Sequence, residues 1–341
     1  MFSILRPLLF SLDPETSHAL TLYALRSTQY LPFLKQIYKV PSKPVHAFGL
    51  TFKNPLGLAA GYDKDGVAVR GLAALGFGHI EVGTVTPKPQ AGNPRPRVFR
   101  LAEDEAAINR MGFPSQGMLK VAGRMSKIAG RKLKVEGKGS VVVGVNLGKN
   151  KDTPLEEAAR DYVELMKVFA PLADYLTINI SSPNTIGLRR LQNREMLENL
   201  LGQINLERET WNLKLPILVK ISPDLSDEEL DDAIGVILDK KMDGIIATNT
   251  TLSREGVRSS LKGETGGLSG GPLKGRSEAV LSRVVKLVGG RVPIISVGGI
   301  ASLEDAKKKT RAGGESCSGV HGADLSRTGI GQRNFEKFVI D

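Results

Sequence analysis

The 341-residue chain holds one cysteine, Cys317, and few aromatic residues. One thiol can form no internal disulfide and no multi-cysteine metal or iron–sulfur site, so a reducing, cytosol-facing compartment is expected. Aromatic residues make up 5% of the chain, which disfavours an all-β sandwich or a surface that stacks RNA bases. No apolar run reaches the ~18 residues that a transmembrane helix needs.

The formal net charge of +11 leaves several partners open. A soluble basic surface, an anionic substrate, an anionic membrane surface and a nucleic acid all fit a positive balance. The sequence contains no RNA-binding motif and no long block of Lys or Arg. Nucleic acid is therefore the weakest of these partners and is not expected.

Residues 1–38 are predicted to form two short apolar helices ahead of the main domain. The opening MFSILRPLLFSL is interrupted by an Arg-Pro pair and precedes no small-residue cleavage site, so no signal peptide or targeting presequence is expected. Asp13, Pro14 and Glu15 have the pattern of a helix start. A helical cap on the core and an interfacial membrane anchor both fit this segment.

Residues 39–313 are predicted to form one α/β domain, because short apolar strands alternate with amphipathic helices and no linker divides them. Capping-box spacings place helix starts at Thr153 with Glu156, Ser226 with Glu229, and Ser302 with Asp305. The expected strands are Leu56–Ala60, Ile80–Val82, Val141–Val145, Leu176–Ile178, Ile217–Val219, Ile245–Ala247 and Ile294–Val297.

Every expected strand is followed by a polar residue or a glycine pair. In chain order these are Lys64, Thr84, Asn146, Asn179, Lys220, Thr248-Asn249 and Gly298-Gly299. Active sites of α/β barrels are built where the carboxyl ends of all the strands converge, whereas a doubly wound sheet places its ligand at one switch point. The pattern therefore predicts a (β/α)8 TIM barrel with an N-terminal helical extension.

The residue types at the carboxyl ends of the expected strands favour a bound redox cofactor. Two lysines supply positive charge, four asparagines supply amide donors and acceptors, and glycine pairs let the backbone approach a ligand. This set suits a planar heterocycle with a carboxylate, and a phosphate near Gly298-Gly299. No histidine lies among the strand ends, and Asp63 has no partner acid, so a Ser-His-Asp triad, a glycosidase pair and a metal site are not predicted.

From about residue 5 to residue 313 the sequence resembles the quinone-dependent (class 2) dihydroorotate dehydrogenases. Nine strings in order carry the resemblance: FKNPLGLAAGYDKDG, GFGHIEVGTVTPKPQAGNPRPRVFRL, INRMGF, GVNLGKNKDTP, INISSPNTIGLR, VKISPDL, ATNTTLSR, TGGLSGGPL and PIISVGGI. The resemblance implies an FMN enzyme that oxidises (S)-dihydroorotate to orotate in pyrimidine (UMP) biosynthesis and passes the electrons to ubiquinone or menaquinone.

The resemblance also implies roles for particular residues. Ser182 would be the base that removes the C5 proton, where class 1 enzymes have a cysteine, and Lys64 would contact both flavin and substrate. The cofactor-binding residues would be Ala60, Gly61, Lys64, Thr84, Asn146, Asn179, Lys220, Thr248, Gly270 and Gly299. The substrate-binding residues would be Asn109, Arg110, Met111, Gly112, Phe113, Asn184, Asn249 and Thr250.

For the quinone, the resemblance implies that the N-terminal helices form its entrance, with His18 and Arg100 beside it. The segment 1–38 would then make a peripheral contact with the cytoplasmic face of the inner membrane. A tRNA dihydrouridine synthase is a distant alternative, because those FMN barrels use a catalytic cysteine and Cys317 lies outside the matching region.

Residues 314–341 depart from the family. The family continues with an eighth strand, a phosphate-binding turn and a helix, whereas this chain reads as a polar, Gly- and Ser-rich tail. With one choice of synonymous codons, a one-base shift across Glu315 to Phe335 encodes KAVQVYTGLIYQGPGLVKEI, an apolar strand, a Tyr-Thr-Gly turn and a helix. We interpret residues 315 to at least 335 as frameshifted by mutation or sequencing error, so the eighth strand is expected to be missing or disrupted. A divergent tail is the alternative, and an inactive remnant is the competing functional hypothesis.

Overall fold

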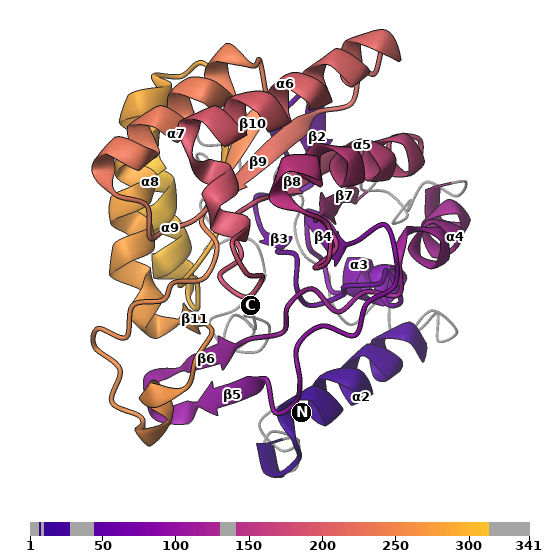
Figure 1. Cartoon of the computed structure of the whole chain (residues 1–341). Helices are drawn as coiled ribbons and strands as arrows, with labels where there is room; N and C mark the ends of the chain where they lie inside the picture. The colour runs from indigo at the N-terminus through magenta and orange to yellow at the C-terminus, as the bar shows by residue number, and fades with distance from the viewer. Residues whose placement is uncertain (1–6, 8–9, 28–43, 130–140, 314–341) are drawn as a thin grey trace.

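The computed structural model describes residue 7 and residues 10–27, 44–129 and 141–313. Its centre is a parallel sheet with the order β12-β10-β9-β8-β7-β4-β3, and helices cover the outside of the sheet (Figure 1). The strands of this sheet are β3 (Gly57–Leu58), β4 (His79–Val85), β7 (Val142–Leu147), β8 (Tyr175–Asn179), β9 (Ile217–Ile221), β10 (Gly244–Ala247) and β12 (Ile294–Ser296).

The remaining elements form the outer layer and two small sheets. The helices are α2 (Pro14–Ser27), α3 (Val69–Ala74), α4 (Met118–Ala129), α5 (Ala158–Phe169), α6 (Arg194–Thr210), α7 (Asp227–Asp239), α8 (Lys274–Val288) and α9 (Leu303–Gly313). The small sheets contain β1 (Val45–Ala47) with β2 (Leu50–Phe52), and β5 (Val98–Leu101) with β6 (Ala106–Asn109) and β11 (Gly267–Gly270).

The strand order confirms the barrel-type α/β fold. All seven predicted strands form, and each pairs in parallel with the next one along the chain in this sheet, with no reversal of order. A doubly wound sheet would reverse its order at a switch point. Within the described residues, β3 and β12 each have one neighbour in the sheet. The predicted fate of the eighth strand lies in residues 314–341, outside the described residues.

Two features of the fold were not predicted. The β1–β2 hairpin covers the amino-terminal end of the sheet, where Val45, Ala47 and Phe52 pack against side chains from β7, β8, β9, β10 and β12. The antiparallel β5–β6–β11 sheet lies at the opposite, carboxyl end, next to α2 (Figure 1). Both are made of strands of three or four residues, which are too short for a periodic pattern to show.

The predicted helix starts have three outcomes. At α7 the Ser226–Glu229 capping box is present in full. At α9 the Asp305 amide donates to Ser302 Oγ at 3.1 Å, which is half of a box. The Thr153 cap is wrong: a 3₁₀ turn (Leu155–Glu157) precedes α5, and the Thr153 hydroxyl donates instead to Asp161 at 2.8 Å, because that buried carboxylate organises the loop.

The predicted N-terminal helix is present as α2. Its first turn is capped by Asp13, whose carboxylate accepts the Thr16 amide hydrogen at 3.0 Å. Leu20 and Tyr23 lie on this helix with 48% and 65% of their surface exposed. No helix in the described ranges is long and apolar enough to cross a membrane. The other predicted helix and residues 28–38 lie largely outside the described residues.

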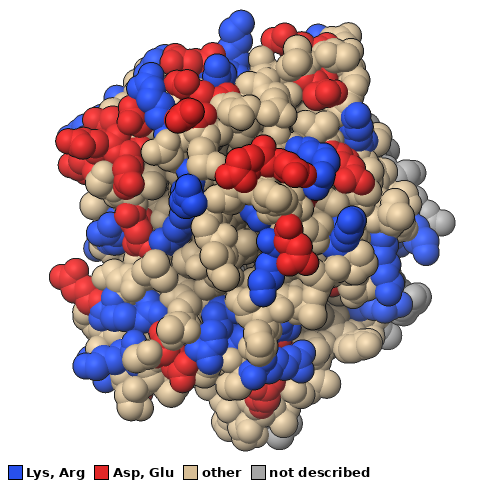
Figure 2. All heavy atoms as spheres, viewed as in Figure 1, with Lys and Arg blue, Asp and Glu red and all other residues tan. Residues whose placement is uncertain are grey.

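The surface charge is uneven (Figure 2). Acidic side chains gather over α7, at the upper left of this view, while Lys and Arg predominate in the lower half. On α7 the acids pair with arginines of neighbouring helices, as in Arg283 with Asp227 and Asp231, and Arg194 with Asp232. The net positive charge is therefore concentrated away from α7 on this face.

His79 makes stability depend on pH. Its ring is buried between Phe52 and Tyr175, and burial lowers its pKa to about 4 from 6.5. Below pH 6.5 the His79 ring is protonated in the unfolded chain but stays neutral in the folded chain. The free energy of unfolding therefore falls between pH 6.5 and 4, by up to about 3 kcal/mol. His79→Leu is expected to flatten this loss in urea unfolding at pH 4.5–7. An exposed control, His46→Gln, should keep the slope of the unaltered protein; an equal slope in His79→Leu would contradict the assignment.

Candidate active site

Polar side chains from successive strands meet inside the carboxyl end of the sheet. Thr84 lies in β4, Asn146 in β7, Asn179 at the end of β8, and Lys220 in β9, while Thr248 follows β10 directly. Each of them is at most 6% exposed. Parallel strands are buried on both faces, so polar residues there are costly unless they find partners. The predicted strand-end residues are thus gathered at one place, as the barrel requires.

Hydrogen bonds join most of these groups directly. The Thr84 hydroxyl donates to Asn146 Oδ1 at 2.6 Å, and Asn179 Nδ2 donates to Thr84 Oγ1 at 2.9 Å. Asn249 Nδ2 donates to Ser181 Oγ at 2.9 Å, and Asn249 Oδ1 accepts the Thr250 amide hydrogen at 2.8 Å. Three predicted flavin residues, Thr84, Asn146 and Asn179, and the predicted substrate residues Asn249 and Thr250 therefore belong to one connected polar network.

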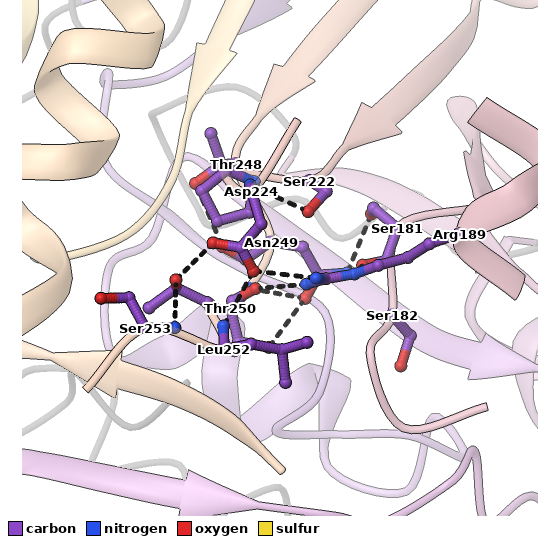
Figure 3. Close-up of polar contacts among 12 residues, drawn as sticks. Ser181, Ser182, Arg189, Ser222, Asp224, Thr248, Asn249, Thr250, Leu252 and Ser253 are labelled. Carbon is purple, nitrogen blue, oxygen red and sulfur yellow. Dashed lines mark hydrogen bonds and ion pairs between the residues drawn. The ribbon is translucent and has the colours of Figure 1, made fainter. Parts of the chain in front are cut away.

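The two adjacent serines have different surroundings (Figure 3). Ser181 donates to Asn179 Oδ1 at 3.2 Å and accepts from Asn249, so its hydroxyl is committed to the network. Ser182 Oγ accepts the Asn184 amide hydrogen at 3.2 Å and points away from the Arg189 guanidinium (Figure 3). Within the part of the chain that the structure describes, the Ser182 hydroxyl donates to no acceptor.

Arg189 forms hydrogen bonds to the loops that follow β8, β9 and β10. Its guanidinium donates to Ser181 O at 3.0 Å, to Thr250 O at 2.9 Å and to Asp224 Oδ2 at 2.8 Å (Figure 3). Burial raises the pKa of Asp224, but hydrogen bonds from Thr251 and Leu252 and the charge of Arg189 outweigh it and hold the pKa below its usual value. The pair keeps the loops after β8, β9 and β10 in fixed relation.

The two predicted lysines differ in their partners. The Lys64 ammonium donates to Gly61 O, and burial followed by the charge of Arg97 lowers its pKa to about 8. Lys220 is 6% exposed, and no side chain or carbonyl in the described ranges accepts a hydrogen bond from it. A mostly buried lysine whose ammonium has no protein acceptor among the described residues is suited to a ligand that supplies one.

The predicted substrate loop is held together by Asn93. Its amide hydrogen bonds Met111 O at 2.9 Å, and its side chain donates to Arg110 O at 2.9 Å and to Asn184 O at 3.1 Å. Asn184 in turn donates to Asn109 Oδ1 at 3.0 Å. The loops that follow β6 and β8 therefore approach each other.

The rest of that loop is shaped by Gly112 and Phe113. Gly112 has φ +68° and no room for a Cβ, which would lie 2.7 Å from the Asn93 amide group. The carbonyls of Gly112 and Phe113 accept hydrogen bonds from Gln90, and the Phe113 ring is buried. Only glycine permits this close approach of the backbone to Asn93.

The predicted glycine positions have two kinds of environment. Gly61, next to Ala60, has φ +114° and open space where a Cβ would lie. Gly299 has φ +70° and packs against the first residue of α8, where a Cβ would meet Lys274 Cα at 2.6 Å. Gly270 has φ +95° and lies against Glu105 O. Gly299 therefore sits at a helix N-terminus, a position that suits a phosphate.

His18 and Arg100 join α2 to the carboxyl end of the sheet. His18 Nε2 lies 2.7 Å from Tyr62 O, in the loop that also carries Gly61 and Lys64. Burial, and then the charge of Lys64, lowers the pKa of His18. Arg100 donates to Leu12 O at 3.0 Å. His18 thus links α2 to a loop of the site, and Arg100 links β5 to the segment just before α2.

Sequence reasoning missed several residues that support the site. Glu81, Arg189 and Asp224 were not singled out, and neither was the buried Arg97–Glu15 ion pair between α2 and the loop before β5. Glu81 had a visible signal, since it is a charged residue inside an apolar strand. Asp63 has a structural role, because its carboxylate accepts the amide hydrogens of Val67 and Ala68. No cluster of potential metal ligands occurs among the described residues.

A singly wound α/β sheet with polar groups and glycine turns at one end of its strands defines an α/β-barrel enzyme. The model of the dihydroorotate dehydrogenase family matches residues 44–324, which extends beyond Gly313. The dihydroorotate dehydrogenase (quinone) of Roseiflexus sp. (strain RS-1) is 49% identical over 319 residues, with 92% of this chain and 86% of the relative covered. That of Idiomarina loihiensis is 47% identical, with 92% of both covered. The chain belongs to the dihydroorotate dehydrogenase family, and to its quinone-dependent class.

Solved structures agree with this assignment. The crystal structure of ligand-free DHODH from Eimeria tenella has a TM-score of 0.83 and 42% identity, covering 96% of this chain and 94% of that chain. The complex of DHODH from the same organism with ferulenol has a TM-score of 0.82 and 41% identity, covering 96% and 90%. The fold therefore matches that of solved members of the family.

Proposed function

We propose that this protein oxidises (S)-dihydroorotate to orotate, with FMN as cofactor and a membrane quinone as electron acceptor, in pyrimidine biosynthesis. The family membership supports the reaction. The observation that carries the site assignment is that the Ser182 hydroxyl, unlike that of Ser181, is not bonded into the amide network and so can face a ligand. Dihydroorotate/orotate and ubiquinone or menaquinone are the proposed partners.

The residues present fit FMN. Lys220 is a mostly buried lysine whose ammonium has no acceptor among the described residues, and the open space at Gly61 allows a flat ring to approach the backbone. The proposed flavin residues are Ala60, Gly61, Lys64, Thr84, Asn146, Asn179, Lys220 and Thr248, with Gly270 and Gly299 for the phosphate. FMN would supply the hydride-accepting chemistry that no amino-acid side chain provides.

The protein's own groups would manage the proton and the charge. Ser182 Oγ would take the C5 proton of dihydroorotate while its own proton passes to water, and FMN would accept the C6 hydride, which leaves orotate. A serine hydroxyl is a weak base, so its surroundings must activate it. Asn109 to Phe113, Asn184, Asn249 and Thr250 would hold the substrate. Lys64 would stabilise negative charge on the pyrimidine carbonyl, which its buried position strengthens.

For the quinone half-reaction we propose that α2 lies at the surface of the inner membrane, on its cytoplasmic face. Exposed Leu20 and Tyr23 give the helix an apolar surface. His18 connects that helix to the Tyr62 loop of the site, and Arg100 connects β5 to Leu12, just before the helix. A quinone that enters beside α2 would thus reach the Tyr62 loop that carries Lys64. A peripheral anchor of this kind needs apolar contact and basic charge.

The function is tested by spectroscopy on the purified protein. Bound flavin absorbs visible light. In the absence of oxygen, dihydroorotate should bleach this absorbance, and a soluble quinone should then restore it. A colourless protein that takes up no added FMN would support the inactive-remnant alternative. A flavoprotein that dihydroorotate does not reduce would support another FMN barrel, such as a tRNA dihydrouridine synthase.

A double substitution tests the membrane contact. Leu20→Glu with Tyr23→Glu should abolish most binding to anionic vesicles and most reduction of a long-chain quinone, because charges replace the apolar surface of α2. Orotate formation with a soluble dye should remain. The matched control is Leu206→Glu on α6, a side chain 64% exposed, which should change neither. Equal vesicle binding by all three proteins would overturn the anchor.

A further inference from the structure

Glu81 is a charged side chain buried inside the sheet, below the proposed flavin residues. It is 3% exposed and lies in the middle of β4. Its Oε1 accepts a hydrogen bond from Asn146 Nδ2 at 2.8 Å. Its Oε2 accepts from the Tyr175 hydroxyl at 3.0 Å and the Thr177 hydroxyl at 3.1 Å. An ionised carboxylate is an acceptor only, so all three contacts run toward Glu81.

The asparagines above Glu81 donate in the same direction. Asn249 Nδ2 donates to Asn179 Oδ1 at 3.3 Å. Asn179 Nδ2 donates to Asn146 Oδ1 at 3.0 Å, and Asn146 donates to Glu81. Three carboxamides, one just after β10, one in β8 and one in β7, thus form a head-to-tail ladder that ends on a carboxylate of β4. We call these four side chains the amide ladder.

The carboxylate decides the polarity of this ladder. A carboxamide has nearly the same shape in both orientations, so packing alone does not distinguish its oxygen from its nitrogen. Reversal of the Asn146 amide would turn its oxygen toward Glu81, an acceptor facing an acceptor at 2.8 Å, and would leave a buried hydrogen bond unmade. The same constraint passes to Asn179, whose Nδ2 donates to Asn146 Oδ1. Asn249, at the far end of the ladder, is oriented by the Thr250 amide hydrogen that its Oδ1 accepts at 2.8 Å.

The Glu81 carboxylate is itself held in place. Tyr175 reaches it because position 144 is glycine: a Cβ there would lie 2.1 Å from the tyrosine ring. Burial, and then the negative charge of Glu81, raises the pKa of Tyr175 well above its usual value, which keeps this hydroxyl a donor. Two hydroxyls therefore fix one carboxylate oxygen, and the other faces Asn146.

We propose that Glu81 is a positioning residue that sets which atom of the Asn146 and Asn179 carboxamides, N–H or carbonyl oxygen, is presented to the ligands. This rests on the proposed function, in which Asn146 and Asn179 contact the flavin and Asn249 contacts the substrate. Thr84 follows the same order, because its hydroxyl donates to Asn146 Oδ1. Glu81 itself touches neither the substrate nor the reacting atoms.

The test compares Glu81→Leu, Glu81→Gln and the control Thr177→Val, each made in the full 341-residue chain. Leucine removes the acceptor, whereas glutamine keeps one oxygen and rescues the ladder if that oxygen faces Asn146. Thr177→Val removes one donor to Glu81 and leaves Asn146 its partner. FMN affinity, orotate affinity and the rate of flavin reduction are measured, with melting temperatures.

Glu81→Leu is expected to weaken FMN binding on the order of 10- to 100-fold, the effect of one lost charge-assisted hydrogen bond. Orotate binding should weaken less, because Asn249 keeps the Thr250 amide hydrogen as a partner. Glu81→Gln should recover most of that loss, and Thr177→Val should change binding less than about 3-fold. Wild-type affinity in Glu81→Leu would overturn the proposal. Equal losses in Glu81→Leu and Thr177→Val, in step with their melting temperatures, would also overturn it, because they indicate a structural role alone.

A ligand-free readout separates this proposal from the function. In protein labelled with ¹⁵N-asparagine, the side-chain amide signals of Asn146 and Asn179 should shift in Glu81→Leu and remain in Thr177→Val. Unchanged signals in Glu81→Leu would refute the ladder, whatever the reaction. Failure of the unaltered protein to bind FMN or orotate would refute the proposed function and leave the amide signals as the test of the ladder.

Discussion

Ser182→Ala is expected to lower the rate of flavin reduction by dihydroorotate about 10²- to 10⁴-fold while FMN binding is retained. The serine hydroxyl is proposed as the base, and alanine has no group that can take the C5 proton. The measurement is anaerobic stopped-flow reduction at saturating dihydroorotate. It is best made on a version of the chain with the C-terminal reading frame restored, so that flavin occupancy does not limit it.

Ser181→Ala is the matched comparison. Its hydroxyl hydrogen bonds Asn179 and Asn249, so its loss should weaken orotate binding more than it slows reduction. Ser182→Ala should show the opposite split. Reduction of Ser182→Ala at nearly the rate of the unaltered enzyme would mean that another group takes the proton.

Restoring the reading frame is expected to have the other large effect. Replacing residues 315–335 with KAVQVYTGLIYQGPGLVKEI should raise FMN content from well below one per chain to about one per chain. In the described residues β3 and β12 each have a single neighbour, and an eighth strand would pair with both. Its Tyr-Thr-Gly turn would add phosphate contacts beside Gly299.

Flavin absorbance after denaturation, with protein concentration measured separately, gives the stoichiometry of both proteins. The restored protein should also have the higher melting temperature, because FMN binds the folded state alone. Full FMN occupancy and turnover in the protein with residues 315–335 unchanged would show that the tail is a tolerated variant and that the frameshift interpretation is wrong. Resequencing the gene across codons 310–341 provides an independent check.

The sequence by itself determined the fold class and the positions of the polar strand ends. Its apolar strands are short but regular, and each is followed by a residue that a buried strand would not otherwise keep, such as Asn146 or Lys220. These are local signals. Parallel pairing of the strands then places all their carboxyl ends at the same edge of the sheet. The family resemblance then supplied the expected roles of these residues, and the structure brings the residues together at one end of the sheet.

Only the tertiary structure decided how these residues are oriented. Glu81 and Asn249 are far apart in sequence, and no local pattern shows that a donor ladder joins them across four strands. The same holds for Arg189, whose guanidinium binds loops after three different strands. Hydrogen-bond direction depends on which groups meet in space, and side chains on neighbouring strands meet only after the sheet has formed.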